Sequence, residues 1–272
     1  MVLINGLPDD RIAISDRGLQ YGDGLFETMT FRAGIVEFID AHLARLMDGC
    51  RRLNIEFVQA EELLNELNII CQILTDNDAI IKIIITRGSG GRGYLAVSGV
   101  EPTRIISTHP LPIYPDHYSQ IGVKSRLCTH TLSENSALAG IKHLNRLDQV
   151  LARNEWHDAD ITEGIMLDQA RNVIEGTMSN VFIVKAGKLF TPTLDKSGVA
   201  GIMRAQIMLL ATELNISVVE TKIHIDDLMA ADEVFITNSV IGIWPVSEMD
   251  NMLYLTGPIT QNLQHVLQQA KK

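Results

Sequence analysis

The first third of the chain mixes short apolar runs with apolar residues at helical spacing. Residues 25–31 and 35–39 are mostly apolar and flank Arg32-Ala33-Gly34, a pattern typical of a β-hairpin. Asp40 then precedes a stretch of helical spacing, so we expect it to cap the N-terminus of a helix. Further on, the pattern predicts a helix over residues 61–74 and buried strands over residues 79–86 and 103–108.

The middle of the chain contains a proline-rich stretch, residues 109–117 (HPLPIYPDH). Proline fixes φ and removes a hydrogen-bond donor, so neither a helix nor a central strand continues there. We interpret this stretch as a linker between an N-terminal α/β domain (1–108) and a C-terminal domain (118–272). Short strands interrupted by helices follow it, which favours an α+β fold with a barrel-like second domain. The expected strands cover residues 122–127, 164–167, 180–184 and 189–191, and the expected helices cover residues 146–157, 202–214 and 261–270.

Composition and charge narrow the classes of ligand. The 272 residues are 46% hydrophobic and 21% charged, which is typical of a globular protein. The formal net charge of −10 argues against nucleic acid or an anionic membrane as a partner, since both need a basic surface. An anionic small molecule would therefore have to be bound by individually placed arginines.

Cysteine usage and the absence of a long apolar stretch indicate the compartment. The three cysteines are widely spaced and form no C-x-x-C pair, which favours a reducing environment. No apolar stretch is long enough for a secretory signal or a membrane span, so we expect a cytoplasmic protein. The histidines lack zinc-ligand spacing, and we expect no metal.

Residues 88–93 (GSGGRG) match the G-x-G-x-x-G spelling of a dinucleotide-binding loop and follow a predicted strand. That fingerprint also requires a helix at the third glycine, whereas residues 94–102 contain Gly99 and Pro102 and show no helical stripe. We interpret the segment as a glycine-rich connection, with a nicotinamide-dependent oxidoreductase as the alternative from another class. Arg92 at its tip could bind a carboxylate through its planar guanidinium group.

Four motifs together resemble the fold-type-IV pyridoxal-phosphate enzymes, the family of D-amino-acid and branched-chain aminotransferases. The resemblance covers nearly the whole chain and implies a two-domain fold of that type and a homodimer. The motifs are DRGLQYGDGLFE (16–27), GIKHLNRL (140–147), EGTMSNVF (175–182), and GIMR (201–204) followed by Thr237-Asn238-Ser239.

Two segments favour one branch of that family. ITRGSGGRGY (85–94) and LAGIKHLNRLDQVLAR (138–153) resemble its lyases, which convert the dicarboxylate 4-amino-4-deoxychorismate to 4-aminobenzoate and pyruvate in folate biosynthesis. An aminotransferase acting on branched-chain or D-amino acids remains the alternative.

The resemblance implies a pyridoxal 5′-phosphate site with Lys142 as the Schiff-base lysine. Such a lysine needs a lowered pKa, which its apolar neighbours Ile141 and Leu144 would favour by desolvation. A carboxylate should lie against the pyridine nitrogen, and the resemblance places Glu175 there. The remaining residues that the resemblance assigns to the cofactor are Arg45, Asn180, Ile202, Met203, Asn238 and Ser239, with Arg45 and the helix start at Ile202–Met203 facing the phosphate.

The substrate residues are inferred from the same resemblance. Related enzymes hold the substrate carboxylate with residues that match Arg92 and Tyr94. D-amino-acid aminotransferases have a tyrosine where this chain has Phe26, which counts against that activity. Thr28 matches a threonine that lyases keep near the cofactor, so we assign it a proton-relay role in catalysis. Asn145 is expected either to bind substrate or to cap the following helix.

Overall fold

The computed structural model describes residues 1–57, 59–75 and 77–270, and the chain forms two compact units. Unit 1 comprises residues 1–112 and 141–145, and unit 2 comprises residues 113–140 and 146–272. The fold is α+β, as expected. No helix in the described ranges is long and apolar enough to cross a membrane.

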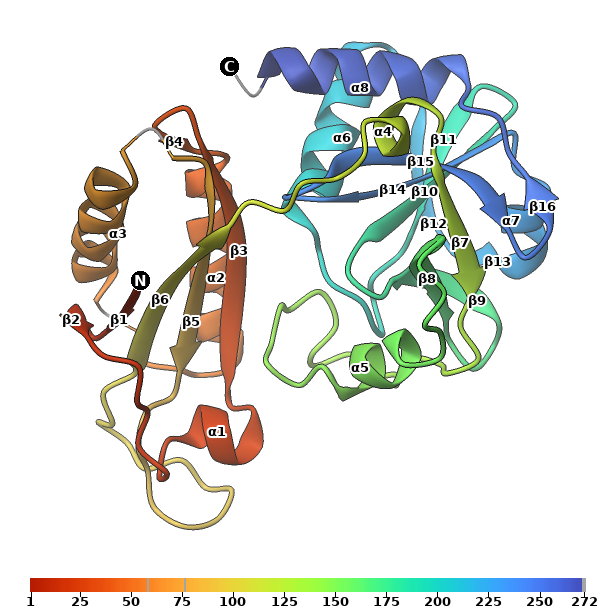
Figure 1. The fold of residues 1–272 in the computed structure, drawn as a ribbon. Helices are drawn as coiled ribbons and strands as arrows, with labels where there is room; N and C mark the ends of the chain where they lie inside the picture. The colour runs from red at the N-terminus through yellow and green to blue at the C-terminus, as the bar shows by residue number, and fades with distance from the viewer. Residues whose placement is uncertain (58, 76, 271–272) are drawn as a thin grey trace. The chain divides into compact units, whose positions relative to one another are not determined.

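Unit 1 is built on a six-stranded antiparallel sheet with the order β2-β1-β6-β5-β3-β4. Side chains alternate between its faces, and one face packs against α2 and α3 (Figure 1). Its elements are β1 (Val2–Ile4), β2 (Leu7–Pro8), α1 (Arg17–Tyr21), β3 (Gly24–Arg32), β4 (Ile35–Val36), α2 (Ile39–Arg52), α3 (Ala60–Leu74), β5 (Ala79–Thr86) and β6 (Thr103–Pro110).

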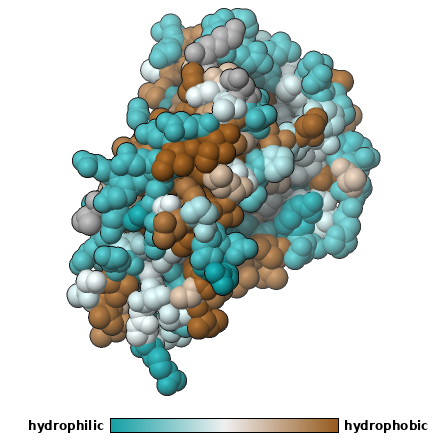
Figure 2. Space-filling model, turned by 60° about the vertical axis from the view of Figure 1, so that its left-hand side comes forward, coloured by the Kyte–Doolittle hydropathy of each residue, from teal (hydrophilic) through white to brown (hydrophobic). Residues whose placement is uncertain are grey.

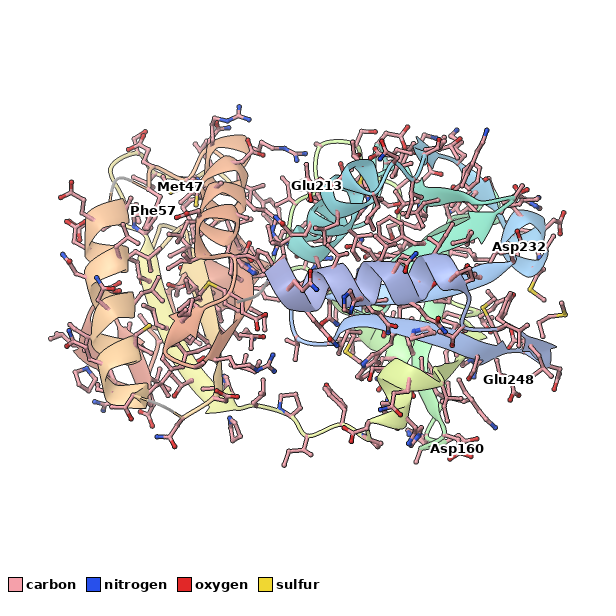
Figure 3. All side chains as sticks on the ribbon, turned by 90° about the horizontal axis from the view of Figure 1, so that it is seen from above. Met47, Phe57, Asp160, Glu213, Asp232 and Glu248 are labelled. Carbon is pink, nitrogen blue, oxygen red and sulfur yellow. The ribbon has the colours of Figure 1, made fainter. Side chains whose placement is uncertain are left out.

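The core of unit 1 lies between the sheet and its two helices. Met29 of β3, Ile83 of β5 and Ile70 of α3 are fully buried in it. Phe57, labelled in Figure 3, lies between α2 and α3 and also joins this core. Phe26 and Thr28, on the other face of β3, are only half-buried.

Unit 2 contains a larger mixed sheet with the order β12-β11-β10-β14-β15-β7-β8-β9-β13, to which β16 adds beside β15. The pairs β11–β12, β15–β7 and β7–β8 are parallel. The strand order begins at β12 and ends at β13, so the pairings form an open series of strands. A barrel-like second domain therefore stays a prediction. The elements are α4 (His117–Gln120), β7 (Val123–Leu127), α5 (Leu147–Arg153), β8 (Ile161–Leu167), β9 (Asn172–Gly176), β10 (Asn180–Lys185), β11 (Lys188–Pro192), α6 (Ile202–Glu213), β12 (Val218–Thr221), β13 (Ile223–His224), α7 (Ile225–Met229), β14 (Glu233–Asn238), β15 (Gly242–Met249), β16 (Met252–Leu253) and α8 (Pro258–Ala270).

Tight turns fix the register within unit 2. The β10–β11 hairpin turns at Ala186-Gly187, where both residues have positive φ. Asp232, labelled in Figure 3, accepts a hydrogen bond from the Ala186 backbone N–H at 2.8 Å.

Figure 2 shows hydrophobic residues in brown patches between hydrophilic ones on the face in view.

Three local expectations differ from the structure. α2 begins at Ile39 after Phe38, which has a left-handed φ of 54°, so Asp40 lies in the first turn and is not the N-cap. Asn145 is not the cap of α5 either, since that position is Arg146. The proline-rich stretch begins inside a strand, because β6 continues to Pro110.

The segment that contains Lys142 also differs from expectation. We expected it in the second domain, whereas residues 141–145 belong to unit 1. The physical reason is that Leu25 and His143 form an antiparallel β-bridge, so the segment pairs with β3.

Candidate functional site

Lys142 is held against β3 by backbone hydrogen bonds on both sides. The Phe26 N–H donates to the Lys142 carbonyl oxygen at 3.0 Å, and the Leu144 N–H donates to the Gly24 carbonyl oxygen at 3.0 Å. The Lys142 ammonium nitrogen lies 4.2 Å from the centroid of the Phe26 ring, a cation–π contact. The strand thus fixes the lysine and the phenyl ring beside each other.

Thr28 lies on the same face of β3 as Phe26, because side chains two residues apart point the same way. Its partner in the register across β5 is Lys82, whose ammonium nitrogen lies 5.5 Å from the Phe26 ring centroid. The half-buried face of this sheet therefore combines a hydroxyl group, an aromatic ring and two lysines. The proton-relay role of Thr28 stays a prediction.

Arg45 of α2 is bound to Glu27, which points to the opposite face of β3 from Phe26. Its Nε donates to Glu27 Oε1 at 2.8 Å and its Nη2 to Glu27 Oε2 at 2.5 Å, and His42 Nδ1 lies 2.6 Å from Glu27 Oε2. Burial raises the pKa of Glu27, but the hydrogen bonds from His42 and Arg45 outweigh it and hold the pKa below its usual value. Glu27 therefore stays ionised and orients the guanidinium group.

Sequence reasoning missed Glu27 and His42, which are each only 1% exposed. One signal was present. Glu27 occupies an inward-facing position between apolar Leu25 and Met29, and a charged residue at such a position is rarely buried without a partner.

In unit 2, Glu175 and Asn180 converge on Val199. The Val199 N–H donates to Glu175 Oε2 at 2.8 Å, and Asn180 Nδ2 donates to the Val199 carbonyl oxygen at 2.9 Å. Gln149 Nε2 donates to Glu175 Oε1 at 3.2 Å. Glu175 is 4% exposed and so sits as a buried acceptor, suited to a cationic ring nitrogen.

The first turn of α6 lies directly after this cluster. Its N-cap, Gly201, has an extended backbone and no side-chain hydrogen bond, and the first turn contains no acidic residue. The N–H groups of Ile202 and Met203 are therefore suited to an anion such as a phosphate. A Cβ at Gly201 would lie 2.0 Å from Asn180 Oδ1, so the close approach requires glycine.

Asn238 and Ser239 lie where β14 ends. Asn238 Oδ1 accepts from the N–H groups of Val240 and Ile241 at 2.9 and 3.0 Å, and its Nδ2 donates to the Met178 carbonyl oxygen at 3.0 Å. The Asn238 side chain thus shapes this turn and ties it to the turn before Asn180. Direct contact of Asn238 and Ser239 with a cofactor stays a prediction.

A buried carboxylate that the sequence did not reveal lies beneath the same region. Glu163 of β8 is 2% exposed and accepts from the hydroxyls of Thr177 and Ser179 at 2.5 and 2.7 Å. Burial raises the pKa of Glu163, against the effect of these donors. Because Thr177 and Ser179 belong to the turn that joins β9 to β10, Glu163 supports the backbone between Glu175 and Asn180.

The expected substrate residues do not form one cluster. Arg92 and Tyr94 lie in the connection between β5 and β6, residues 87–102, which contains no helix, in agreement with the expectation. Both are exposed, Tyr94 by 88%, and its ring packs edge-on against Tyr21. Asn145 Nδ2 donates to the Gly22 carbonyl oxygen at 3.0 Å and so ties the Lys142 segment to the turn before β3.

Each unit contains side chains of the chemical types that pyridoxal phosphate requires. Unit 1 has the Lys142 amine and Arg45, whose guanidinium group is held by Glu27. Unit 2 has the buried Glu175 carboxylate and the start of α6, which has no side-chain cap. Across the described part of the chain, no three His, Cys, Asp or Glu side chains are grouped so that they could hold a metal ion.

Comparisons with known proteins identify the family. The model of the amino-transferase class IV family matches residues 24–249. The chain is 38% identical to an aminodeoxychorismate lyase of Vibrio harveyi over 97% of this chain and 98% of the relative. It is 34% identical to a putative branched-chain-amino-acid aminotransferase of Methanocaldococcus jannaschii over 94% and 89%. The structure of a 4-amino-4-deoxychorismate lyase from Pseudomonas aeruginosa superimposes with a TM-score of 0.95 at 44% identity over 99% and 98% of the two chains.

Proposed function

The chain belongs to the amino-transferase class IV family, and from that premise we propose that it is a lyase converting 4-amino-4-deoxychorismate to 4-aminobenzoate and pyruvate. The observation that carries the proposal is the similarity to lyases from Vibrio harveyi and Pseudomonas aeruginosa along almost the whole chain. The family is one of pyridoxal-phosphate-dependent enzymes, and the residues described above fit that cofactor.

Lys142 is the proposed attachment point and the proton carrier. Pyridoxal phosphate supplies an electron sink that stabilises negative charge at the amine-bearing carbon of the substrate. Lys142 then takes the proton from that carbon, and Thr28 or Lys142 returns a proton to the departing enolpyruvyl unit. Loss of the proton and of the leaving group makes the ring aromatic, so positioning accounts for much of the catalysis.

The other cofactor residues hold charge. Glu175 keeps the ring nitrogen protonated, and a pair of unit charges at ~4 Å contributes about 4 kcal/mol at intermediate dielectric. Arg45 and the N–H groups of Ile202 and Met203 bind the phosphate. We also assign Asn180, Asn238 and Ser239 to the cofactor pocket. Asn180 supports it through its hydrogen bond to the Val199 carbonyl oxygen, and Asn238 through its hydrogen bond to the Met178 carbonyl oxygen.

The substrate carries two carboxylates, whereas the protein has a net charge of −10. We assign Arg92 and Tyr94 to one carboxylate and Asn145 to the pocket, because a planar guanidinium group binds a carboxylate bidentately. The proposal also includes a homodimer, by family resemblance, and a cytoplasmic location, for which the free thiols of Cys50, Cys71 and Cys128 are support.

The proposed function is tested by incubating purified protein with pyridoxal phosphate and 4-amino-4-deoxychorismate and measuring 4-aminobenzoate, with and without a 2-oxo acid. A lyase needs no 2-oxo acid. The alternative, an aminotransferase for branched-chain or D-amino acids, cannot turn over without one, and activity that depends on it would refute the lyase.

Lys142→Ala tests the attachment point. We expect it to abolish the visible absorbance of the holoenzyme and covalent fixation by borohydride while the circular dichroism spectrum is kept. Lys188→Ala, at the exposed first position of β11, is the matched control and should retain both signals. If borohydride fixes the cofactor to the Lys142→Ala variant at the wild-type level, Lys142 is not the attachment point.

A further inference from the structure

Arg17, within the motif of residues 16–27, has no role in the proposed reaction so far. It is the first residue of α1 and is only 3% exposed. Arginine is rarely buried to that extent unless its donors are paired. The contacts of its guanidinium group therefore indicate what it does.

The guanidinium group connects Asp23 to the glycine-rich connection. Its Nε donates to Asp23 Oδ2 at 2.9 Å, its Nη1 to the Gly93 carbonyl oxygen at 2.9 Å, and its Nη2 to the Tyr94 carbonyl oxygen at 3.0 Å. A planar group with three occupied edges fixes the orientation of the backbone it binds. Two successive carbonyl groups of the connection are held in this way.

Packing adds to these hydrogen bonds. The guanidinium carbon of Arg17 lies 4.9 Å from the Tyr21 ring centroid, and that ring lies 5.5 Å from the ring of Tyr94. A Cβ at Gly90 would approach Arg17 Cδ to 2.9 Å, so the connection lies close against the side chain there. Arg92 stands between these contacts in the sequence and is itself exposed.

Asp23 is anchored from a second side, which provides a matched comparison. Arg87 donates to Asp23 from its Nε at 2.7 Å and from its Nη2 at 3.0 Å, and its Nη2 and Nη1 also donate to the carbonyl oxygens of Leu53 and Asn54. Both arginines donate to the Asp23 carboxylate. Of the hydrogen bonds described for the two side chains, those to residues 93 and 94 come from Arg17.

We infer that Arg17 is a positioning residue for the substrate: it fixes residues 90–94 so that Arg92 and Tyr94 are held ready for a substrate carboxylate. The inference deepens the proposed function and rests on it. A binding loop that is ordered beforehand loses less conformational freedom on binding, so the effect falls on substrate affinity. The Arg17 guanidinium group donates to Asp23 and to residues 93 and 94, so we expect the proposed cofactor residues to keep their own contacts.

Arg17→Lys and Arg87→Lys test the inference. Lysine keeps the charge but cannot make three planar hydrogen bonds. In the holoenzyme we expect Arg17→Lys to raise KM for 4-amino-4-deoxychorismate by about tenfold or more, with kcat within about threefold and an unchanged affinity for pyridoxal phosphate. Arg87→Lys should keep the wild-type KM. Equal KM values for the two variants would overturn the inference.

Limited proteolysis gives a readout that does not depend on activity. Trypsin cleaves after Arg92, and we expect faster cleavage there in Arg17→Lys than in Arg87→Lys. Faster cleavage without a change in KM would show that the loop does not serve the substrate, and so would refute the inference. A wild-type protein without lyase activity refutes the proposed function, and equal cleavage in the two variants separately refutes the role of Arg17.

Gly90→Ala is a second variant for the case that Arg17→Lys fails to fold. Its added methyl group displaces the loop from Arg17 while the arginine remains. We expect the same two effects, a raised KM and faster cleavage after Arg92, with circular dichroism like that of the wild type. A folded Gly90→Ala protein with wild-type KM and cleavage would also overturn the inference.

Discussion

Replacing Glu27 with glutamine should destabilise unit 1 and release Arg45. The wild-type carboxylate is 1% exposed and accepts two hydrogen bonds from Arg45, and His42 Nδ1 lies 2.6 Å from it. Removing one partner of a buried ion pair costs about 3–5 kcal/mol, because the other charge stays buried without compensation. Arg45 keeps 14% of its side chain in water, so we expect the lower end, about 3 kcal/mol.

Urea unfolding followed by far-UV circular dichroism measures this loss. With a slope of about 2 kcal/mol per molar urea, the midpoint should fall by about 1.5 M. Both tryptophans, Trp156 and Trp244, lie in unit 2, so their fluorescence reports on unit 2 in the same samples. Asp48→Asn is the control. Asp48 pairs with Arg51 on the same helix, but both are exposed, so its removal should cost less than about 1 kcal/mol.

The effect of pH gives a second check on Glu27. Because its pKa in the folded protein lies below the usual value, its contribution to stability is present above the usual carboxyl pKa and is lost as pH falls through the lowered value. The difference between wild type and Glu27→Gln should therefore shrink in acid. If Glu27→Gln unfolds at the same urea concentration as Asp48→Asn at neutral pH, the reasoning about this buried pair is wrong.

Three further predictions concern unit 2 and the thiols. Gly201→Ala should weaken pyridoxal-phosphate binding at least tenfold in an absorbance titration, because its Cβ would collide with Asn180 Oδ1, and unchanged binding would contradict the site. Burial raises the pKa of Glu163, so its contribution to the free energy of unfolding is lost as pH rises through that raised value. Glu163→Gln should lack this dependence on pH, and a variant with the same dependence as the wild type would contradict the prediction. Burial raises the pKa of Cys128 to about 12, so iodoacetamide should label it more slowly than the half-buried Cys71 in native protein, and equal rates would refute this.

Strongly patterned elements were predictable from the sequence. β5 has the expected bounds, since a run of β-branched residues between turn signals has few other solutions, and α6 begins at the expected Ile202. β15 was missed because Pro245 lies inside it, and proline normally marks an edge or an interruption. In the structure Pro245 pairs with Phe235 of β14, and the register with β7 shifts just after it.

The candidate site was predictable only where a motif carries it. Lys142 and Glu175 were assigned through their motifs and stay predictions, and both lie in surroundings suited to their proposed roles. Glu27 and Arg45 are 18 positions apart, and their contact depends on how α2 packs on β3, which no local pattern encodes. Arg17 was likewise visible only as part of a motif, because its partners at residues 93 and 94 come close only when the strands pair.

The placement of residues 141–145 restricts how this protein can be divided. The chain leaves unit 1 after residue 112 and re-enters it for five residues, so a fragment ending at the proline-rich stretch contains β3 without the lysine that pairs beside it. A chimaera that exchanges only residues 1–112 with a relative would combine Phe26 from one parent with Lys142 from the other. Recombination between family members should therefore preserve activity best when both pieces of unit 1 come from the same parent.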